Sequence, residues 1–420
     1  YMAYYTIAHI LKTIDPTKLT DEVFDYVFHG KGDASSISST TGIPQETLRH
    51  MRREFEYWYP LDYRMSANEL IPNHLTFHIF HHALLFPDRC PHGVVSFGVA
   101  VLGGEKMSSS KGNIVAINEA VHKYGADTVR LYLMSTVEPW QDLDWRTSEV
   151  EAMQRSLERF YSLAESIITP PAAKHPSFTQ SERWMLSRLQ EHIRMTTEAL
   201  DAFETRKAAQ HAFFQLMLDL RWYIKRARQP KARDHMLKRV LEVWLRLLVP
   251  FTPHICEDLW ERTGGSGFIS AAPWPKVEEG LIDKGAELIE SYLERVLEDV
   301  GKILHVTKVE KPKRVCLYVA QDWKWKAYRI AMERVGEGKV DLGVLLREIG
   351  EKLGPRLHKS DLSKFLQQTL QELRGMPPEE LEILKTTEID ELRVLLEASD
   401  FIQEQLNVKE MRVFLSLIHI

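Results

Sequence analysis

The sequence predicts a multidomain fold with α/β and all-α parts: the C-terminal half of a Rossmann-like parallel-sheet domain, a helical bundle, and a small α/β domain. Three observations support this prediction. Strand-like and helix-like segments alternate through residues 61–135, as in a parallel α/β domain. From Asp144 onward, long segments with a 3.6-residue apolar period follow one another. Strand patterns return after Lys311. We therefore expect three domains, at residues 1–143, 144–305 and 306–420.

Length and composition indicate a globular protein with more than one core. A chain of 420 residues is longer than a single ordinary core requires. Its apolar fraction of 44% and charged fraction of 27% are those of a globular protein. No stretch is apolar enough over the length of a bilayer, and the N-terminus lacks a signal-peptide pattern, so we expect no membrane partner.

The cysteines and the net charge further restrict the kind of protein that this sequence can encode. Cys90, Cys256 and Cys316 are odd in number and far apart, which excludes a disulfide framework and predicts no structural metal site. Such cysteine usage is typical of a reducing cytoplasm, where we expect the protein to reside. The net charge of −5 gives no overall nucleic-acid signal, so contact with nucleic acid requires a local basic face.

The first 58 residues are predicted to form helices separated by one flexible loop. The loop covers residues 30–42, a stretch rich in Ser, Gly and Thr. Half of a Rossmann-like sheet cannot bury both of its faces, so we expect the native sequence to extend before Tyr1. We also expect residues 416–420 not to be native. The predicted helices cover residues 1–14, 19–28 and 44–58.

The next segment contains a turn that suits a nucleotide. A predicted strand over residues 61–66 leads through Ala67, Asn68 and Glu69 into an apolar helix over residues 70–86. Ligands of doubly wound sheets bind where a strand ends and a helix begins. Glu69 could therefore accept hydrogen bonds from the hydroxyls of a ribose, and helix capping is the competing interpretation.

The helix over residues 70–86 also carries four histidines. His74 and His78 lie one turn apart on one face, which is a spacing that suits a metal ion. No Glu or Cys stands at ligand spacing beside them. We therefore favour histidines that are packed or hydrogen-bonded, and the same holds for His81 and His82.

The loop at residues 103–113 has the parts of a polyphosphate site. It follows a predicted strand over residues 94–102 and contains two glycines, three serines, Lys106 and Lys111. Glycines let backbone N–H groups approach an anion, hydroxyls donate hydrogen bonds and lysines neutralise charge. The spacing of a Walker A loop is absent. From these residues alone, a phosphate site and a polar connector are both open. Helices are predicted next at residues 117–123 and 126–135.

The predicted bundle contains a strongly basic section. Only Asp234 opposes its positive charge, and Trp222 and Tyr223 are interleaved with the basic residues. A surface for a nucleic-acid backbone and a solvated helix face explain this pattern equally well. The basic residues are Arg221, Lys225, Arg226, Arg228, Lys231, Arg233, Lys238 and Arg239. The bundle helices are predicted at residues 149–168, 181–203, 206–228, 234–260 and 284–308.

The last predicted domain alternates strands and helices around basic and tryptophan-rich edges. Its strands are expected at residues 315–319 and 411–415, and the two prolines Pro377 and Pro378 are expected to break the chain. The helices are expected at residues 323–335, 342–353, 360–374 and 388–405.

Several stretches together resemble the class I aminoacyl-tRNA synthetases. Lys106-Met107-Ser108-Ser109-Ser110 is similar to the Lys-Met-Ser-Lys-Ser signature of that class. Residues 59–77 and residues 1–6 resemble the leucyl-tRNA synthetases of the archaeal and eukaryotic cytosolic type. Residues 248–260 are similar to part of the helical domain in the leucyl, isoleucyl and valyl group.

The resemblance implies a two-step reaction in the complete enzyme. Leucine attacks the α-phosphate of ATP in the presence of Mg²⁺, and the leucyl group then passes from the adenylate to tRNA. It implies a catalytic role for Lys106 and Lys111, because positive charge must stabilise the triphosphate in the transition state. The implied ATP-binding residues are Ala67, Glu69, His74, Lys106, Met107, Ser108, Ser109, Ser110 and Lys111.

Two positions depart from the pattern of the family. Ser109 stands where the family has its second lysine, so Lys106 and Lys111 are left to supply the charge on the phosphates. Ala67 stands where other members have a glycine before the acidic ribose contact. Its Cβ could alter the close approach of the backbone to the nucleotide.

The implied partners are leucine tRNA, leucine and ATP, and we expect a monomer. Because the His-Ile-Gly-His motif and the editing domain of the family would precede Tyr1, we expect this chain alone to bind tRNA weakly and not to aminoacylate it. An isoleucyl-, valyl- or methionyl-tRNA synthetase is the nearest alternative, and a noncatalytic RNA-binding paralogue is another. The C-terminal domain is also expected to bind tRNA. In the helical domain, tRNA contacts are implied for Arg221, Lys225, Arg226, Arg228, Lys231 and Arg233.

Overall fold

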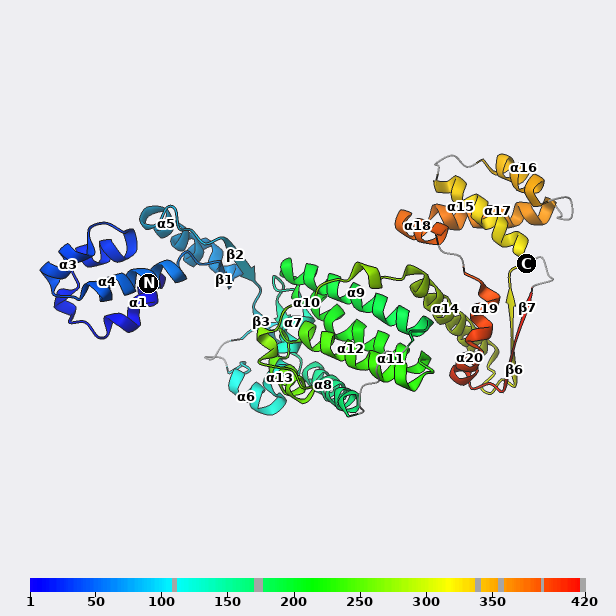
Figure 1. Ribbon diagram of the computed structural model, residues 1–420, viewed down its shortest axis with the longest axis horizontal. Coiled ribbons are helices and arrows are strands. Elements are labelled where there is room, and N and C mark those ends of the chain that lie inside the picture. The colour runs from blue at the N-terminus through cyan, green and yellow to red at the C-terminus, as the bar shows by residue number, and fades with distance from the viewer. Residues whose placement is uncertain (108–111, 170–176, 337–340, 354–358, 387–388, 416–420) are drawn as a thin grey trace. The chain divides into compact units, whose positions relative to one another are not determined.

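The computed structural model confirms a mixed fold of helices and small parallel sheets (Figure 1). It describes residues 1–107, 112–169, 177–336, 341–353, 359–386 and 389–415. The chain divides into two compact units, the first of which contains Tyr1–Gln154 and Phe203–Arg206. The second contains Arg155–Ala202 and Lys207–Ile420. The division into three domains stays a prediction.

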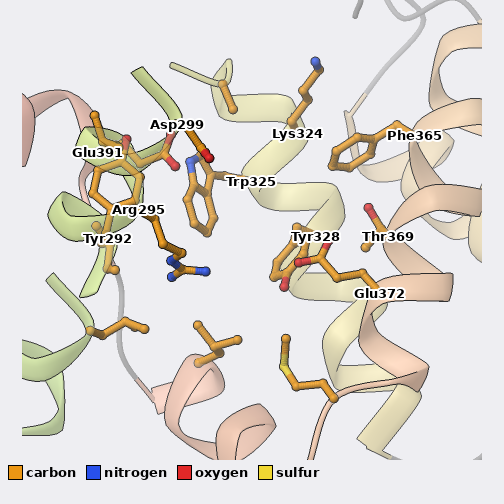
Figure 2. Close-up of a pocket in the computed structure, with 16 residues that line it drawn as sticks. Tyr292, Arg295, Asp299, Lys324, Trp325, Tyr328, Phe365, Thr369, Glu372 and Glu391 are labelled. Carbon is orange, nitrogen blue, oxygen red and sulfur yellow. The ribbon is translucent and has the colours of Figure 1, made fainter. Parts of the chain in front are cut away.

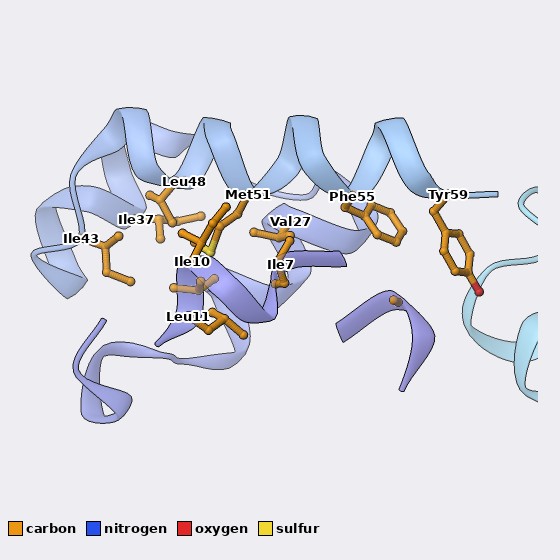
Figure 3. Close-up of a cluster of buried hydrophobic side chains, with 12 residues drawn as sticks. Ile7, Ile10, Leu11, Val27, Ile37, Ile43, Leu48, Met51, Phe55 and Tyr59 are labelled. Carbon is orange, nitrogen blue, oxygen red and sulfur yellow. The ribbon is translucent and has the colours of Figure 1, made fainter. Parts of the chain in front are cut away.

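The first unit begins with a helical subdomain around a compact apolar core (Figure 3). Ile7, Leu48, Met51 and Phe55 are fully buried in it. Burial of an aliphatic or aromatic side chain contributes about 1.5–3 kcal/mol, so these helices are held mainly by this core. The elements are α1 (Met2–Leu11), α2 (Asp21–Phe24), the π-helical turn η2 (Asp25–His29), α3 (Ala34–Thr41) and α4 (Gln45–Trp58).

Helix α3 shows that the predicted flexible loop over residues 30–42 is wrong. The Asp33 carboxylate caps the helix, because it accepts hydrogen bonds from the backbone N–H groups of Ser35 and Ser36 at 3.0 and 3.1 Å. Ile37 anchors the helix in the core, and Gly42 ends it with a φ of 66°. The burial of Ala34 and Ile37, together with the cap, thus orders a serine-rich segment.

A parallel pair of strands follows this subdomain. Strand β1 (Tyr63–Ala67) pairs with β2 (Gly93–Phe97), and the connection between them contains α5 (Thr76–Leu85). Three large apolar side chains of α5 are exposed, namely Phe77 at 64%, Phe80 at 62% and Leu84 at 81%.

A second small sheet holds β4 (Glu105–Lys106), β3 (Ala100–Leu102) and β5 (Leu143–Asp144) in that order. Strand β3 runs antiparallel to β4 and parallel to β5. The predicted single strand over residues 94–102 is therefore two strands in two sheets. The break lies at Gly98, whose N–H donates to the Pro139 carbonyl at 2.8 Å. A Cβ at Gly98 would lie 2.2 Å from the Gln141 carbonyl oxygen, so only glycine permits this approach.

Helices α6 (Ile117–Tyr124) and α7 (Ala126–Thr136) complete the first unit. They share an apolar cluster with β5, and Tyr124, Tyr132 and Trp145 are among its buried members. Helix α8 (Thr147–Ile168) begins in the first unit and continues into the second.

The second unit contains the predicted bundle. Trp244 is fully buried at its centre, donates its indole N–H to the Ala212 carbonyl at 2.7 Å and packs edge-on against Phe160. The remaining helices are α9 (Gln180–Asp201), α10 (Thr205–Ala209), the π-helical η6 (Gln210–Gln215), α11 (Leu216–Arg226), α12 (Pro230–Leu248), α13 (Pro253–Arg262) and α14 (Lys284–Thr307). Of these, α10 begins in the short segment Phe203–Arg206 of the first unit and continues into the second.

The last part of the chain packs on α14. Strands β6 (Arg314–Val319) and β7 (Glu410–Leu415) are parallel, and Val319 and Phe401 share a buried cluster with Leu293 of α14. The break predicted at Pro377 and Pro378 is present, because α17 ends at Arg374 and a separate helix, α18 (Pro378–Thr386), begins at the second proline, which is tolerated in the first turn of a helix. The other helices are α15 (Asp322–Gly336), α16 (Leu342–Leu353), α17 (Lys359–Arg374), α19 (Glu391–Glu397) and α20 (Ser399–Leu406).

The predicted helix over residues 388–405 is two helices, α19 and α20, which meet at the buried Ala398. Within the described residues, no helix combines the length and the apolar character that a bilayer crossing requires.

Candidate functional site

The carboxyl end of β1 leads into the turn that sequence reasoning singled out. Ala67 is the last residue of the strand and pairs with Phe97 of β2. A 3₁₀ turn, η3 (Asn68–Leu70), and a π-helical turn, η4 (Ile71–Leu75), then connect β1 to α5. The side chain of Glu69 therefore stands at the carboxyl edge of a parallel strand pair, the edge at which α/β proteins bind their ligands.

Lys106 lies directly beside Glu69, although 37 residues separate them in the chain. Lys106 Nζ donates to Glu69 Oε2 at 2.6 Å, and the side chains are 60% and 52% exposed. Solvent screens an ion pair this exposed, which limits its stabilising contribution to less than about 1 kcal/mol. Both groups are therefore open to solvent and can exchange their contact with each other for contacts with a ligand.

A tight turn explains how Lys106 reaches this position. Gly103 and Gly104 have φ values of 61° and 80° and form a two-residue hairpin loop between β3 and β4. Two consecutive positive φ values are the requirement of a type I′ turn, which glycine meets without strain. Asn113 fixes the far side of the loop, because its amide donates to the Lys106 carbonyl at 3.2 Å.

The other residues that were predicted to bind the nucleotide lie in different surroundings. The backbone of Ala67 has a φ of −68°, so this position does not require the conformational freedom of glycine. The imidazole of His74 accepts a hydrogen bond from the guanidinium of Arg64 at 2.8 Å. Met107 packs against the apolar cluster of α6 and α7. Ser108, Ser109, Ser110 and Lys111 lie outside the described residues.

Arg64 was missed by sequence reasoning. It alternates with Tyr63 and Met65 along β1, so it points to the opposite face of the strand, and it orients His74 at the same edge as Glu69. An arginine inside a short apolar strand was the signal that could have identified it.

The other histidines of α5 are packed or hydrogen-bonded: His78 packs against the ring of buried His82, and exposed His81 contacts the Phe77 carbonyl of its own helix. The Nδ1–H of His82 donates to the His78 carbonyl at 2.7 Å, which leaves Nε2 to accept from the hydroxyl of Tyr59. Burial, followed by the nearby His82 and Arg64, lowers the pKa of His78 to about 4. These side chains line a cavity of about 360 Å³. Within the described ranges, no group of three possible ligands is placed to hold a metal ion.

The basic section of the bundle is partly exposed and partly used internally. Arg221 and Lys225 on α11 and Lys231 at the start of α12 are exposed. Arg228 pairs with Glu404 at 2.9 Å, with both side chains at least half exposed. Half-buried Arg233 contacts the neighbouring Asp234 at 3.4 Å, and each of these pairs is weak enough to open.

Arg226 is withdrawn from this surface. Its guanidinium forms a two-pronged pair with Glu290 at 2.7 and 2.8 Å, and its side chain is only 11% exposed. It also lies over the ring of Phe401, 4.8 Å from the ring centre. The structure thus corrects its assignment as a phosphate contact, because these bonds commit the guanidinium to the interior.

The interleaved aromatic residues are also internal. Tyr223 is fully buried and donates to Glu182 at 2.9 Å, and Trp222 donates its indole N–H to Glu290 at 2.9 Å. They therefore belong to the core between α9, α11 and α14. Lys238 donates to the Ile168 carbonyl and Arg239 pairs with Glu278, which leaves Arg221, Lys225 and Lys231 as the most open cations of the section.

Comparisons with known proteins show what this chain is similar to. A family profile described as the anticodon-binding domain of tRNA ligase matches residues 182–319, and one described as tRNA synthetases class I (M) matches residues 36–157. Leucine–tRNA ligase of Pyrococcus furiosus is 41% identical over 97% of this chain, and that of Methanosarcina barkeri is 40% identical over the same share. Over nearly its whole length, this chain is thus similar to a part of the leucine–tRNA ligases.

This chain spans about 42% of the length of those ligases. The relatives at about 40% identity over nearly the whole chain are leucine–tRNA ligases. A solved complex described as Agrobacterium radiobacter K84 agnB2 LeuRS-tRNA-LeuAMS is 24% identical and covers 56% of this chain and 30% of its own. Its TM-score of 0.47 is too low to add to the assignment.

Proposed function

We propose that this chain supplies two parts of a leucine–tRNA ligase, an enzyme that activates leucine with ATP and transfers it to tRNA. The first part is the edge of the β1–β2 strand pair, which contacts the ATP, and the second is a surface that binds tRNA. One observation carries the proposal. The two residues assigned to ribose and phosphate from separate motifs, Glu69 and Lys106, lie 2.6 Å apart at the carboxyl end of a parallel strand pair.

Nucleotide binding exchanges this contact for two others. The ribose hydroxyls donate to the Glu69 carboxylate, and the freed ammonium of Lys106 turns to the triphosphate. The lysine is then placed where negative charge develops as leucine attacks the α-phosphate. Lys111, outside the described residues, is proposed as a second source of charge. Mg²⁺ is proposed to arrive with ATP, bound mainly to its phosphates.

The exposed cations of the basic section are proposed to contact the tRNA backbone. Phosphate contacts of this kind give affinity without sequence information. Arg221, Lys225, Arg228, Lys231 and Arg233 remain in this set. We further propose a cytoplasmic location, since Cys90 and Cys316 are exposed free thiols that suit a reducing compartment. The monomeric state remains a proposal from the resemblance alone.

The nucleotide half of the proposal is tested by binding of a fluorescent ATP analogue to the purified chain. We expect Glu69→Gln and Lys106→Ala each to weaken binding by about tenfold, the loss expected for one charge-assisted hydrogen bond. Lys123→Ala is the matched control, because Lys123 is an exposed lysine of the same unit that pairs loosely with Glu151 at 3.9 Å. Equal binding by all four proteins would remove the nucleotide role of this edge.

The tRNA half is tested by the salt dependence of binding to a leucine tRNA transcript. We expect Lys225→Ala and Lys231→Ala each to lower the slope of log K against log salt by about 1, because each phosphate contact releases about one counterion. Lys302→Ala removes an exposed lysine of α14 and serves as the control. Unchanged slopes in the first two variants would exclude this surface.

A further inference from the structure

A cavity of about 430 Å³ lies in the C-terminal part of the second unit, outside the sites described above (Figure 2). Its walls come from α14 on one side and from α15 and α17 on the other. Ligand pockets in proteins occupy about 300–1,000 Å³, so the space suits a small planar group together with some of the atoms to which that group is bonded. Sequence reasoning missed this cavity, because its lining comes from helices far apart in the chain.

Aromatic rings form much of the lining. Tyr292 of α14, Trp325 and Tyr328 of α15, and Phe365 of α17 all face the cavity. Trp325 packs edge-on against Tyr328, with ring centres 6.0 Å apart, and the polar groups of Trp325 and Ala320 lie near the Glu391 carboxyl and favour its charged form. Burial nevertheless raises the pKa of Glu391. Rings that pack against each other in this way offer a stacking surface.

Charged groups face the same space. Figure 2 shows the guanidinium of Arg295 directed into the cavity toward Tyr328 and Glu372. Within the described part of the chain Arg295 forms no ion pair, and its Nε reaches only the Ser291 carbonyl of its own helix at 3.4 Å. Its donors are therefore available to a ligand, as are the acceptor oxygens of Glu372.

We propose that this cavity binds one unpaired nucleobase of an RNA, an inference that rests on the proposed tRNA-binding function and assigns it a second site. Rings with an adjoining arginine are the usual means of holding an unstacked base. The base stacks on the α15 wall, Arg295 donates to its acceptor atoms, and Glu372 accepts from its N–H groups. The lining also holds the carboxylates of Asp299 and Glu391 and the ammonium of Lys324.

The test compares two labelled 12-residue probes by fluorescence anisotropy. One is an RNA of alternating adenosine and cytidine, and the other is an abasic oligomer with the same phosphates. We expect the whole chain to bind the RNA about tenfold more tightly, the size expected for one stacked base. Trp325→Leu and Arg295→Gln should each remove most of that difference, whereas Trp325→Phe retains a ring and should stay within about twofold of the wild type.

Arg412→Gln is the matched charge control, because Arg412 is an exposed arginine on β7 of the same unit and does not line the cavity. It should weaken both probes equally. Melting curves of each variant show whether the fold is retained. Equal binding of the two probes by the wild type, or a full base preference in Trp325→Leu and Arg295→Gln, would overturn the proposal.

The two proposals fail in different ways. If the Lys225 and Lys231 variants lose tRNA affinity while the cavity variants keep their base preference, only the cavity is excluded. If the wild type discriminates the RNA from the abasic oligomer through the cavity but does not bind a leucine tRNA, the proposed tRNA function fails and the base site stands.

Discussion

Removal of Arg226 should destabilise the second unit far more than removal of a surface arginine. Its guanidinium meets the Glu290 carboxylate at 2.7 and 2.8 Å, and Glu290 is 1% exposed. Arg226→Leu leaves that carboxylate buried with one remaining donor, Trp222 Nε1 at 2.9 Å. Breaking a buried pair in this way costs about 3–5 kcal/mol, and the remaining indole bond places the expected loss near 3 kcal/mol.

The assay is urea unfolding followed by tryptophan fluorescence, with melting as a second measure. For a unit of this size, a loss of about 3 kcal/mol lowers the midpoint of melting by about 6–12 °C. The double variant Arg226→Leu/Glu290→Leu should recover most of the stability, because no unpaired charge is left inside.

The refuting result is specific. If Arg226 were a surface phosphate contact, Arg226→Leu would change the free energy of unfolding by less than about 0.5 kcal/mol and would lower the salt slope of tRNA binding by about 1. That outcome, or a double variant as unstable as the sum of the single ones, would contradict the structural role.

Three further predictions concern the first unit. Lys106→Ala should change its free energy of unfolding by less than about 1 kcal/mol in urea titrations, because the pair with Glu69 is exposed; a larger loss would make the pair structural. The pKa of His78 is lowered to about 4 in the folded state, so the unfolded chain takes up the proton first as pH falls from about 6.5 to 4. Stability should therefore decline through that window, and His78→Gln should show a smaller drop in melting temperature between pH 7 and pH 5; an equal drop would assign the loss elsewhere. Gly98→Ala places a Cβ 2.2 Å from the Gln141 carbonyl and should cost about 1–3 kcal/mol in a melting experiment, whereas an unchanged melting temperature would show that the backbone yields there.

Apolar periodicity predicted most helices to within a few residues, because each long helix buries one continuous stripe. The failures have local causes. Helix α3 was predicted as a loop, since its serines have weak helix preference and its stability comes from the Asp33 cap and the burial of Ile37. The break at Gly98 depends on a backbone 43 residues away, which no local pattern reveals.

In the candidate site, too, local sequence patterns did not predict which residues contact each other. Motif spacing identified Glu69 and Lys106 separately, but the contact between them follows from the Gly103-Gly104 hairpin and the pairing of β3. The basic section was recognised by composition, which counts charges and cannot show that Arg226 points into the core toward Glu290. Basic residues at helical spacing therefore predict a nucleic-acid-binding surface only when it is also known which of them form ion pairs with residues of other helices.

The outer face of α5 has a practical consequence for work with this protein. Phe77, Phe80 and Leu84 expose more than 60% of their surface on one short helix. Water accommodates such apolar area at a free-energy cost that grows when sulfate or phosphate is added. Samples should therefore associate more readily at high concentrations of these salts, and light scattering should rise with protein concentration under those conditions. Storage at low concentrations of sulfate or phosphate is the corresponding choice for solution measurements.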